Sequence, residues 1–299
     1  MRMNEWAPPA YADPAALGER DVAVGPVGGT LTGPRARARA GVVLLSGGGP
    51  FDRDGTAGPN KPLKDLAWGL AGHGIASVRF DKPAGQAATM ADEYVPFAAD
   101  AVRQLRDLVE RVFAVGHSMG GKVAPRVAET AAVDGLVLLA ADAEPMHRAA
   151  VRVTRHLASL DPAYAEVARQ IEGQVAALDG LTPETPPEEL PFGLPASYWA
   201  DLLDYDPVAT AGALGLPMFV AQGGRDYQVT VADDLVRWRA ALGGRPDVTF
   251  KVYEADDHMF FPGSGPSSPA DYLRPQHVDP EVVADVAAWL LATACLNLN

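Results

Sequence analysis

The sequence contains a single cysteine, few basic residues and no long apolar run. The lone Cys295 cannot form an intramolecular disulfide, and a metal cluster built from cysteine ligands is excluded. The 25 Lys and Arg residues are outnumbered by 38 Asp and Glu residues, giving a formal charge of −13 that argues against a nucleic-acid partner. The one basic cluster, RARARA at 35–40, is expected to be a solvated hairpin loop.

No window reaches the roughly 18 to 20 uninterrupted apolar residues that a membrane-spanning helix needs. Residues 1–20 are broken by prolines and charges and contain no apolar signal core, so we expect a cytoplasmic protein with an N-terminal extension. With 48% hydrophobic residues, the 299-residue chain can bury a large core. One large α/β domain that carries an insertion is favoured over two independent domains.

Eight strand-like runs lie along the chain, at 21–26, 28–33, 40–46, 74–81, 111–116, 133–141, 216–223 and 248–254. Most are short and apolar throughout, which is typical of strands covered on both faces of a mostly parallel sheet. Helical patterns alternate with them, at about 62–73, 97–110, 119–131, 230–242 and 280–296. The alternation predicts a doubly wound α/β sheet, with the first two strands forming an antiparallel hairpin at its edge.

The segment 143–212 interrupts this alternation with amphipathic helical stretches and a Pro/Glu-rich tract. Because insertions of this length usually carry function, we expect a helical cap, or lid, between the sixth and seventh strands. The core domain would then comprise 21–142 and 213–296. The alternative is a helical layer elsewhere on the surface.

The stretch Gly116-His117-Ser118-Met119-Gly120 lies between a predicted strand and a predicted helix. A G-x-S-x-G sequence in this setting is typical of a nucleophile elbow, in which a strained turn exposes the serine hydroxyl. Ser118 is therefore the candidate nucleophile, and a merely structural turn is the alternative.

A serine hydroxyl needs a base within hydrogen-bond reach, and the base needs an acid that orients it. Of the six histidines, His258 directly follows the last strand and is the candidate base, although a solvated loop histidine is the alternative. His117, next to Ser118, is expected to point away. Asp226 follows the next-to-last strand and is the favoured acid, while Asp142, after the sixth strand, could reach the same histidine.

Acyl transfer also needs N–H donors aimed at the developing oxyanion. We expect these from the backbone of Met119 and of Gly48, which lies in a Gly triplet without the spacing of a phosphate loop. Further candidate substrate contacts are Phe51, Arg53, Tyr198 and Trp199. Alternatively, Arg53 joins a charge network with neighbouring Asp residues, Arg79 and Asp81, and the two aromatic residues belong to the core of the cap.

Several long stretches, among them SGGGPFDRDG, VFAVGHSMGGKVAP, AQGGRDYQVTVADD and DDHMFFPGSGPSSPADYL, resemble bacterial α/β-hydrolases of the EstD-type carboxylesterase group. The resemblance runs from about 21 to 292. It implies an α/β-hydrolase fold, the triad Ser118, Asp226 and His258, oxyanion contacts around Gly48, and no cofactor. The sequence departs from the group where Ser46-Gly47-Gly48-Gly49-Pro50 replaces His-Gly-Ser-Gly-Pro.

The leading hypothesis is a serine hydrolase that cleaves a carboxylic ester or thioester of a small or medium organic molecule. A second hypothesis keeps the triad but assigns it to elimination, acyl transfer or cyclisation in a biosynthetic pathway, because fold alone does not fix chemistry. A third is a catalytically silent ligand-binding protein. We expect no metal, no nucleic-acid partner and no membrane association, and the sequence leaves the oligomeric state open.

Overall fold

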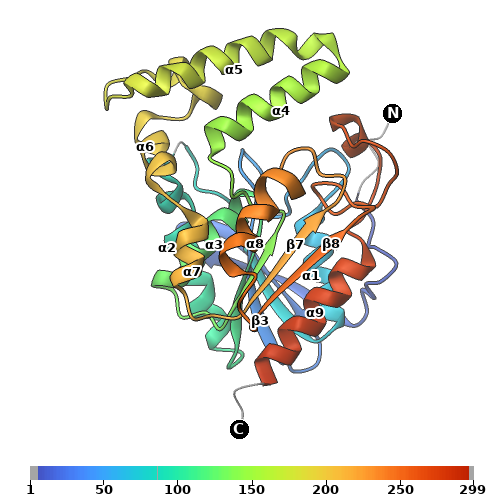
Figure 1. Cartoon of the computed structure of the whole chain (residues 1–299). Helices are drawn as coiled ribbons and strands as arrows, with labels where there is room; N and C mark the ends of the chain where they lie inside the picture. The colour runs from blue at the N-terminus through green and yellow to red at the C-terminus, as the bar shows by residue number, and fades with distance from the viewer. Residues whose placement is uncertain (1–5, 86, 296–299) are drawn as a thin grey trace.

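The computed structural model describes residues 6–85 and 87–295, and an eight-stranded sheet runs through its centre (Figure 1). The strands are β1 (Leu17–Val24), β2 (Val27–Pro34), β3 (Ala40–Leu45), β4 (Ile75–Phe80), β5 (Val112–His117), β6 (Leu136–Leu139), β7 (Met218–Gly223) and β8 (Val248–Tyr253). Their order in the sheet is β1-β2-β4-β3-β5-β6-β7-β8. All eight predicted strands are present, and β1 and β2 form the predicted antiparallel hairpin.

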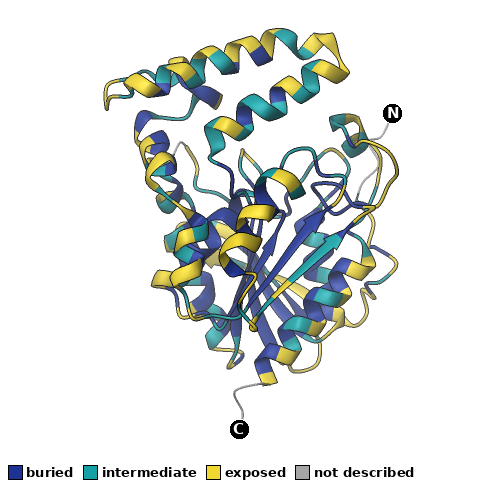
Figure 2. Ribbon diagram, viewed as in Figure 1, coloured by how far each residue is buried: buried dark blue, intermediate teal, exposed yellow. Residues whose placement is uncertain are grey.

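The apolar composition of the strands matches their position in the sheet. Strands β3 to β7 are buried along their whole length, whereas β8 at one edge is largely half-buried (Figure 2). The pairings among strands β3 to β8 are all parallel, whereas β2 pairs antiparallel with β4. The carboxyl ends of these strands therefore meet at one edge of the sheet, which is where a site is expected in an open α/β fold.

Helices cover both faces of the sheet. One face packs against α1 (Pro62–Gly72) and α9 (Pro280–Cys295), and the other against α2 (Met90–Arg106), α3 (Met119–Thr130) and α8 (Val236–Leu242), which continues the π-helix η5 (Val231–Leu235). Helix α2 begins before the predicted residue 97, because Thr89 caps its N-terminus by accepting a hydrogen bond from the backbone N–H of Asp92 at 3.0 Å. Residues 1–5 of the expected extension and residue 296 of the expected last helix lie outside the described residues.

Between β6 and β7 the chain forms α4 (Met146–Leu160), α5 (Ala165–Ala177), α6 (Ala196–Asp204) and α7 (Pro207–Ala213). Short 3-10 helices are η1 (Pro162–Tyr164), η2 (Leu178–Gly180), η3 (Pro187–Glu189), η4 (Pro191–Gly193) and, near the C-terminus, η6 (Pro269–Leu273). Helices α4 and α5 pack together above the carboxyl ends of the strands (Figure 1). In contrast, α6 packs on α2, and α7 packs on α3 and α8. None of the helices in the described part of the chain is long and apolar enough to cross a membrane.

Candidate active site

Ser118 lies in a sharp turn between β5 and α3. Its backbone has φ 55° and ψ −123°, a conformation that costs a non-glycine residue about 1–3 kcal/mol unless the surroundings hold it. Two glycines make the turn possible, because a Cβ at Gly116 would lie 2.2 Å from the carbonyl oxygen of Gly120, and one at Gly120 would lie 2.3 Å from that of Leu45. The backbone N–H of Ser118 donates to the carbonyl of Leu139 at 2.9 Å, which anchors the turn to β6.

His258 and Asp226 form a buried pair after β8 and β7. Nδ1 of His258 lies 2.7 Å from Oδ2 of Asp226, and the two side chains are 4% and 0% exposed. The carboxylate of Asp226 also accepts hydrogen bonds from the side-chain amide of Gln222 at 3.0 Å and from the backbone N–H groups of Gln228 and Val229 at 2.7 and 3.0 Å. Burial lowers the pKa of His258, but the charge of Asp226 and the hydrogen bond to it outweigh burial and raise the pKa above its usual value.

His117 packs against His258, with their ring centroids 4.8 Å apart. Nε2 of His117 lies 2.7 Å from the backbone oxygen of His258, so this nitrogen carries a proton and donates it. Burial and the nearby charge of His258 lower the pKa of His117 to about 3. The sequence predicts that His117 points away from Ser118; its ring is directed to the backbone of the His258 loop, and the residue is one of those that line a small cavity with Ser118 and His258. It supports the histidine loop as a neutral donor.

The buried Tyr94 orients the glycine loop that follows β3. Its hydroxyl lies 3.0 Å from the carbonyl oxygens of both Ser46 and Gly47. In a trans peptide the N–H points opposite to the carbonyl, so the N–H of Gly48 is directed away from Tyr94. Gly48 lines the cavity beside Ser118. Tyr94 is thus a support of the predicted oxyanion loop that the sequence analysis did not identify.

Lys82 and Tyr198 connect the same loop to the insertion. Nζ of Lys82 donates to the carbonyl of Gly49 at 2.9 Å and pairs with Glu93 at 3.0 Å. The hydroxyl of Tyr198, on α6, donates to Glu93. Glu93, which binds both Tyr198 and Lys82, therefore links helix α6 to the glycine loop through Lys82. Tyr198 also lines the larger of the two cavities beside Ser118, where a substrate contact was predicted.

Met119 begins α3 immediately after Ser118. The N–H groups of the first turn of a helix have no partner within the helix, and they lie at its positive end. A Cβ at Gly48 would lie 3.1 Å from Cε of Met119, so the glycine loop passes directly over this helix start. The two segments predicted to donate to an oxyanion are therefore neighbours.

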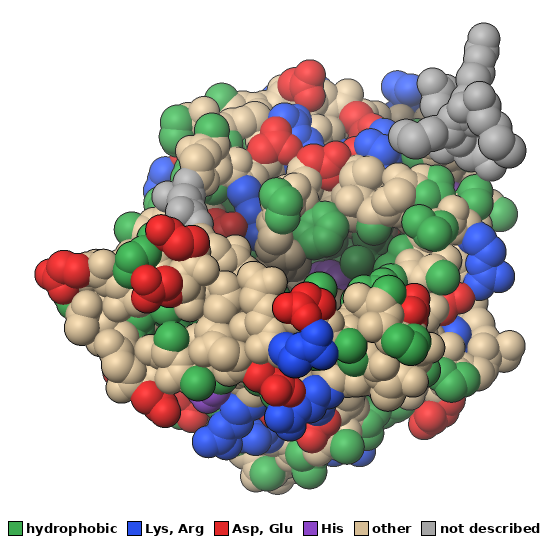
Figure 3. Space-filling model, turned by 90° about the horizontal axis from the view of Figure 1, so that it is seen from above, with side chains coloured by type: hydrophobic (Ala, Val, Ile, Leu, Met, Phe, Trp, Pro, Cys, Tyr) green, Lys and Arg blue, Asp and Glu red, His purple; other side chains and the backbone are tan. Residues whose placement is uncertain are grey.

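Ser118 lies where two cavities meet. A small cavity of about 70 Å³ is lined by Ser118 and His258, and a larger one of about 820 Å³ is lined by Ser118 and by residues of α4. Gly48 and the predicted substrate contact Phe51 line both. Seen from above, this face of the molecule is hollowed, with hydrophobic side chains around the hollow (Figure 3). Ser118 thus borders an apolar chamber on one side and, on the other, the small cavity that it shares with His258.

Asp142 follows β6 and lines the larger cavity. Its Oδ1 lies 3.5 Å from Oγ of Ser118, at the long limit of a hydrogen bond. Burial raises the pKa of Asp142 to about 6, in opposition to the nearby positive charge of Lys122. Of the two carboxylates that the sequence leaves open as partners of the base, Asp226 contacts His258 and Asp142 contacts Ser118.

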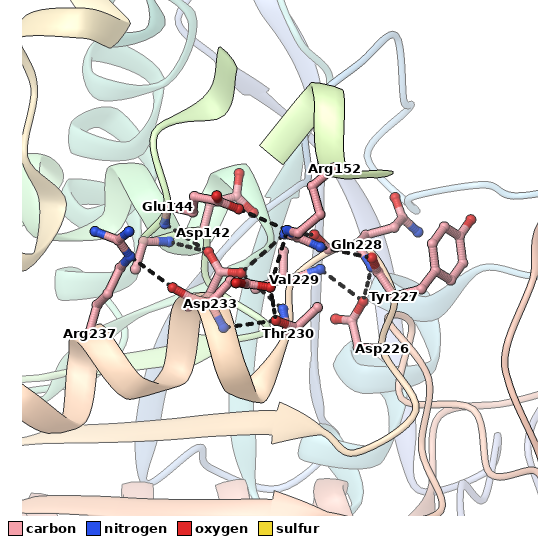
Figure 4. Close-up of polar contacts among 12 residues, drawn as sticks. Asp142, Glu144, Arg152, Asp226, Tyr227, Gln228, Val229, Thr230, Asp233 and Arg237 are labelled. Atoms are coloured by element: carbon pink, nitrogen blue, oxygen red, sulfur yellow. Dashed lines mark hydrogen bonds and ion pairs between the residues drawn. The ribbon is translucent and has the colours of Figure 1, made fainter. Parts of the chain in front are cut away.

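Arg152 of α4 joins the insertion to the loop that carries Asp226 (Figure 4). Its Nε lies 2.9 Å from a carboxylate oxygen of Glu144. Its terminal nitrogens donate to the backbone carbonyls of Tyr227 and Gln228 at 3.2 and 3.0 Å. One side chain of the insertion therefore fixes the segment directly after Asp226.

Two predicted substrate contacts lie away from these cavities. Arg53 pairs with Asp81 and donates to Thr30 at 3.1 Å, in a separate charged depression on the surface, so the predicted charge network is present. Trp199 is fully buried, and its indole N–H donates to the carbonyl of Pro191 at 3.2 Å. The structure thus places Arg53 in an ion-pair network and Trp199 in the interior packing.

Known proteins agree with this architecture. The model of the alpha/beta hydrolase family matches residues 42–286, a range that includes Ser118, Asp226 and His258. The chain belongs to the α/β hydrolase family. Esterase EstD of Thermotoga maritima is 35% identical over 96% of this chain and 71% of its own length, which confirms the resemblance to EstD-type carboxylesterases. The protein is therefore a hydrolase.

Solved structures share the fold of this α/β hydrolase at low sequence identity. An esterase of Pyrococcus furiosus superposes with a TM-score of 0.60 at 16% identity, covering 98% of this chain and 99% of the other. A proline iminopeptidase of Mycobacterium smegmatis superposes with a TM-score of 0.57 at 18% identity, covering 93% of this chain and 99% of the other. Because one neighbour is named an esterase and the other an iminopeptidase, the fold does not select the bond that is cleaved.

Proposed function

We propose that this α/β hydrolase is a serine esterase that hydrolyses a carboxylic ester or thioester of a small or medium organic molecule. Ser118 is the nucleophile, His258 the general base and Asp226 the acid that orients the base. The observation that carries the proposal is the 2.7 Å contact between Nδ1 of His258 and Asp226, made by an imidazole that lines the same cavity as Ser118. Such a contact fixes the tautomer that leaves Nε2 free to accept a proton.

In the first step, Oγ of Ser118 turns from Asp142 toward His258 by rotation about the Cα–Cβ bond and attacks the carbonyl carbon. Nε2 of His258 takes the hydroxyl proton, and Asp226 stabilises the resulting imidazolium. The N–H groups of Gly48 and Met119 hold the oxyanion, an effect of about 3 kcal/mol for each donor.

The leaving alcohol or thiol then takes the proton from His258, and the acyl group stays on Ser118. A water molecule then enters, and its oxygen attacks the acyl carbon while His258 takes one of the water's protons. The acid departs and the proton returns to Oγ of Ser118. The balance of the two steps is one ester and one water consumed, and one acid and one alcohol or thiol formed.

The insertion 143–212 acts as a cap on a core formed by 21–142 and 213–296. The support for this role is the larger cavity, whose wall includes Met146, Ala149 and Val153 of α4. An apolar wall of this kind accepts an acyl chain and excludes bulk water from the reacting carbonyl.

The proposal is tested with a fluorophosphonate probe and nitrophenyl esters of short and medium acids. We expect wild type to be labelled and active, Ser118→Ala to lose both labelling and turnover, and Asp226→Asn to lose about 10³- to 10⁴-fold in kcat, because the imidazole is no longer held in the required tautomer. Asp204→Asn, at an exposed residue of α6, is the matched control and should behave as wild type. A larger loss in Asp142→Asn than in Asp226→Asn would contradict the assignment of the acid.

A further inference from the structure

The larger cavity has an apolar wall with one carboxylate that is not engaged by a cation. Its apolar lining includes Phe51, Met146, Val153 and Leu194. Lys82 and Glu93, which also line it, pair with each other at 3.0 Å. Asp234, another lining residue, is saturated: its carboxylate accepts the backbone N–H groups of Ala143, Glu144 and Thr230 at 2.8 to 2.9 Å.

Asp142 differs from these charged neighbours. Within the described part of the chain, its carboxylate takes part in no ion pair, and its hydrogen bond is the 3.5 Å contact with Oγ of Ser118. The ammonium of the nearby Lys122 is directed to the carbonyl of Glu144, at 3.5 Å. Since an ionised carboxylate offers about four acceptor positions, Asp142 has acceptor capacity to spare where a substrate would lie.

We expect the leaving group and the acyl chain of an ester to lie on opposite sides of Ser118, one in each cavity. The leaving group must reach His258 to be protonated, and His258 lines the small cavity. The acyl chain therefore extends into the larger cavity, which Asp142 lines. With Asp142 so close to the attacking oxygen, its carboxylate is within reach of groups on the first carbons beyond the scissile carbonyl.

We propose that Asp142 is a substrate-binding residue that selects acyl groups with a hydroxyl or ammonium donor on carbon 2 or carbon 3, and that it rejects acyl groups bearing a carboxylate there. This inference rests on the proposed esterase function and names the acyl class for the same site. A donor recovers the hydrogen bond that Asp142 loses when Ser118 turns toward His258, whereas an anion meets a like charge at short range.

The test compares kcat/KM for four methyl esters of similar acyl size: butanoate, 2-hydroxybutanoate, 3-hydroxybutanoate and monomethyl succinate. A hydrogen bond between a charged and a neutral group corresponds to a discrimination of about 10- to 100-fold. Wild type should therefore favour at least one hydroxy ester over butanoate and disfavour the succinate. Because a 2-hydroxyl also activates the carbonyl, the decisive quantity is the change in each ratio between proteins.

Three variants complete the design. Asp142→Asn removes the charge and should reduce discrimination against the succinate about 10-fold, and Asp142→Ser should in addition remove most of the preference for hydroxy esters. Asp204→Asn, at an exposed position of α6, is the control and should keep the wild-type ratios. Circular dichroism and fluorophosphonate labelling show whether each variant is folded.

The outcomes separate the two proposals. If wild type is labelled and hydrolyses methyl butanoate, but the kcat/KM ratios between the esters are the same in the Asp142 variants, the inference is overturned and the proposed esterase function stands. Wild type that is neither labelled nor active on any of the four esters overturns the proposed function, and the inference with it. Ratios that change in Asp204→Asn as much as in the Asp142 variants also overturn the inference.

Discussion

Replacing Asp256 by Asn should stabilise the protein progressively as pH rises from 5 to 7. Asp256 lies two residues before His258, is fully buried, and neither of its carboxylate oxygens has a hydrogen-bond partner in the described part of the chain. Burial raises the pKa of Asp256 to about 7, and the negative charge of Asp279 adds to the effect. The folded protein therefore holds a proton on this carboxyl group that the unfolded chain releases at much lower pH.

The magnitude follows from proton linkage. An unfolded Asp has a pKa of about 3.9, so between about pH 4 and 7 the folded chain binds one more proton than the unfolded chain. The contribution of Asp256 to stability is complete below pH 4 and falls by about 1.4 kcal/mol per pH unit until it levels off above pH 7. Because Asn does not titrate, the advantage of Asp256→Asn should grow by about 1–3 kcal/mol between pH 5 and 7, with water screening part of the full effect.

The assay is urea unfolding at pH 5, 6, 7 and 9, followed by tryptophan fluorescence and fitted with a common slope for wild type and variant. Working with the difference between the two proteins cancels the titration of every group they share. Asp204→Asn, an exposed substitution, should show no pH-dependent difference from wild type. A difference for Asp256→Asn that is constant from pH 5 to 9, or that shrinks with rising pH, would refute the reasoning about this buried carboxyl group.

Three further outcomes are expected. Tyr94→Phe frees the loop around Gly48 and should lower kcat on nitrophenyl esters about 10-fold with little change in KM, because the oxyanion forms only in the transition state. Asp226→Asn should move the acid limb of the residual kcat/KM profile to lower pH, because Asp226 raises the pKa of His258. Arg152→Met removes a half-buried guanidinium that binds Glu144 and the backbone carbonyl of Tyr227, and should lower the free energy of unfolding by about 1–2 kcal/mol, measured in urea.

The sheet and the serine turn were predictable from local sequence. Strands such as β3 and β5 are continuous apolar runs, and the glycine at 116 is required by a close contact within the turn itself, whereas that at 120 is required by the close approach of the end of β3. Periodicity alone thus indicates where the chain passes through the core and where it must turn sharply.

The supports of the site were not predictable in the same way. Tyr94 lies before the helix that the sequence predicts from residue 97, and its role depends on how α2 packs against a loop 47 residues earlier in the chain. Trp199 is the opposite case, because the sequence predicted a role that the structure does not support. A large aromatic residue in the insertion is a reasonable candidate for a substrate contact, but packing buries it completely. The roles of Tyr94 and Trp199 both depend on long-range contacts, which a local sequence pattern does not predict.

The choice between Asp142 and Asp226 as the acid also depends on contacts that the local sequence does not predict. Strands β6, β7 and β8 are adjacent and parallel, and Asp142, Asp226 and Asp256 all follow their carboxyl ends, so chain order favours Asp226 but the fold brings all three carboxylates to one edge of the sheet. The hydrogen-bond donors around each carboxylate distinguish the three residues. The carboxylate of Asp226 accepts from His258, from the Gln222 amide and from two backbone N–H groups of its own loop, whereas burial raises the pKa of Asp142 to about 6 and that of Asp256 to about 7. Among the three, the carboxylate that contacts the imidazole and is held by these donors is the one placed to stabilise an imidazolium.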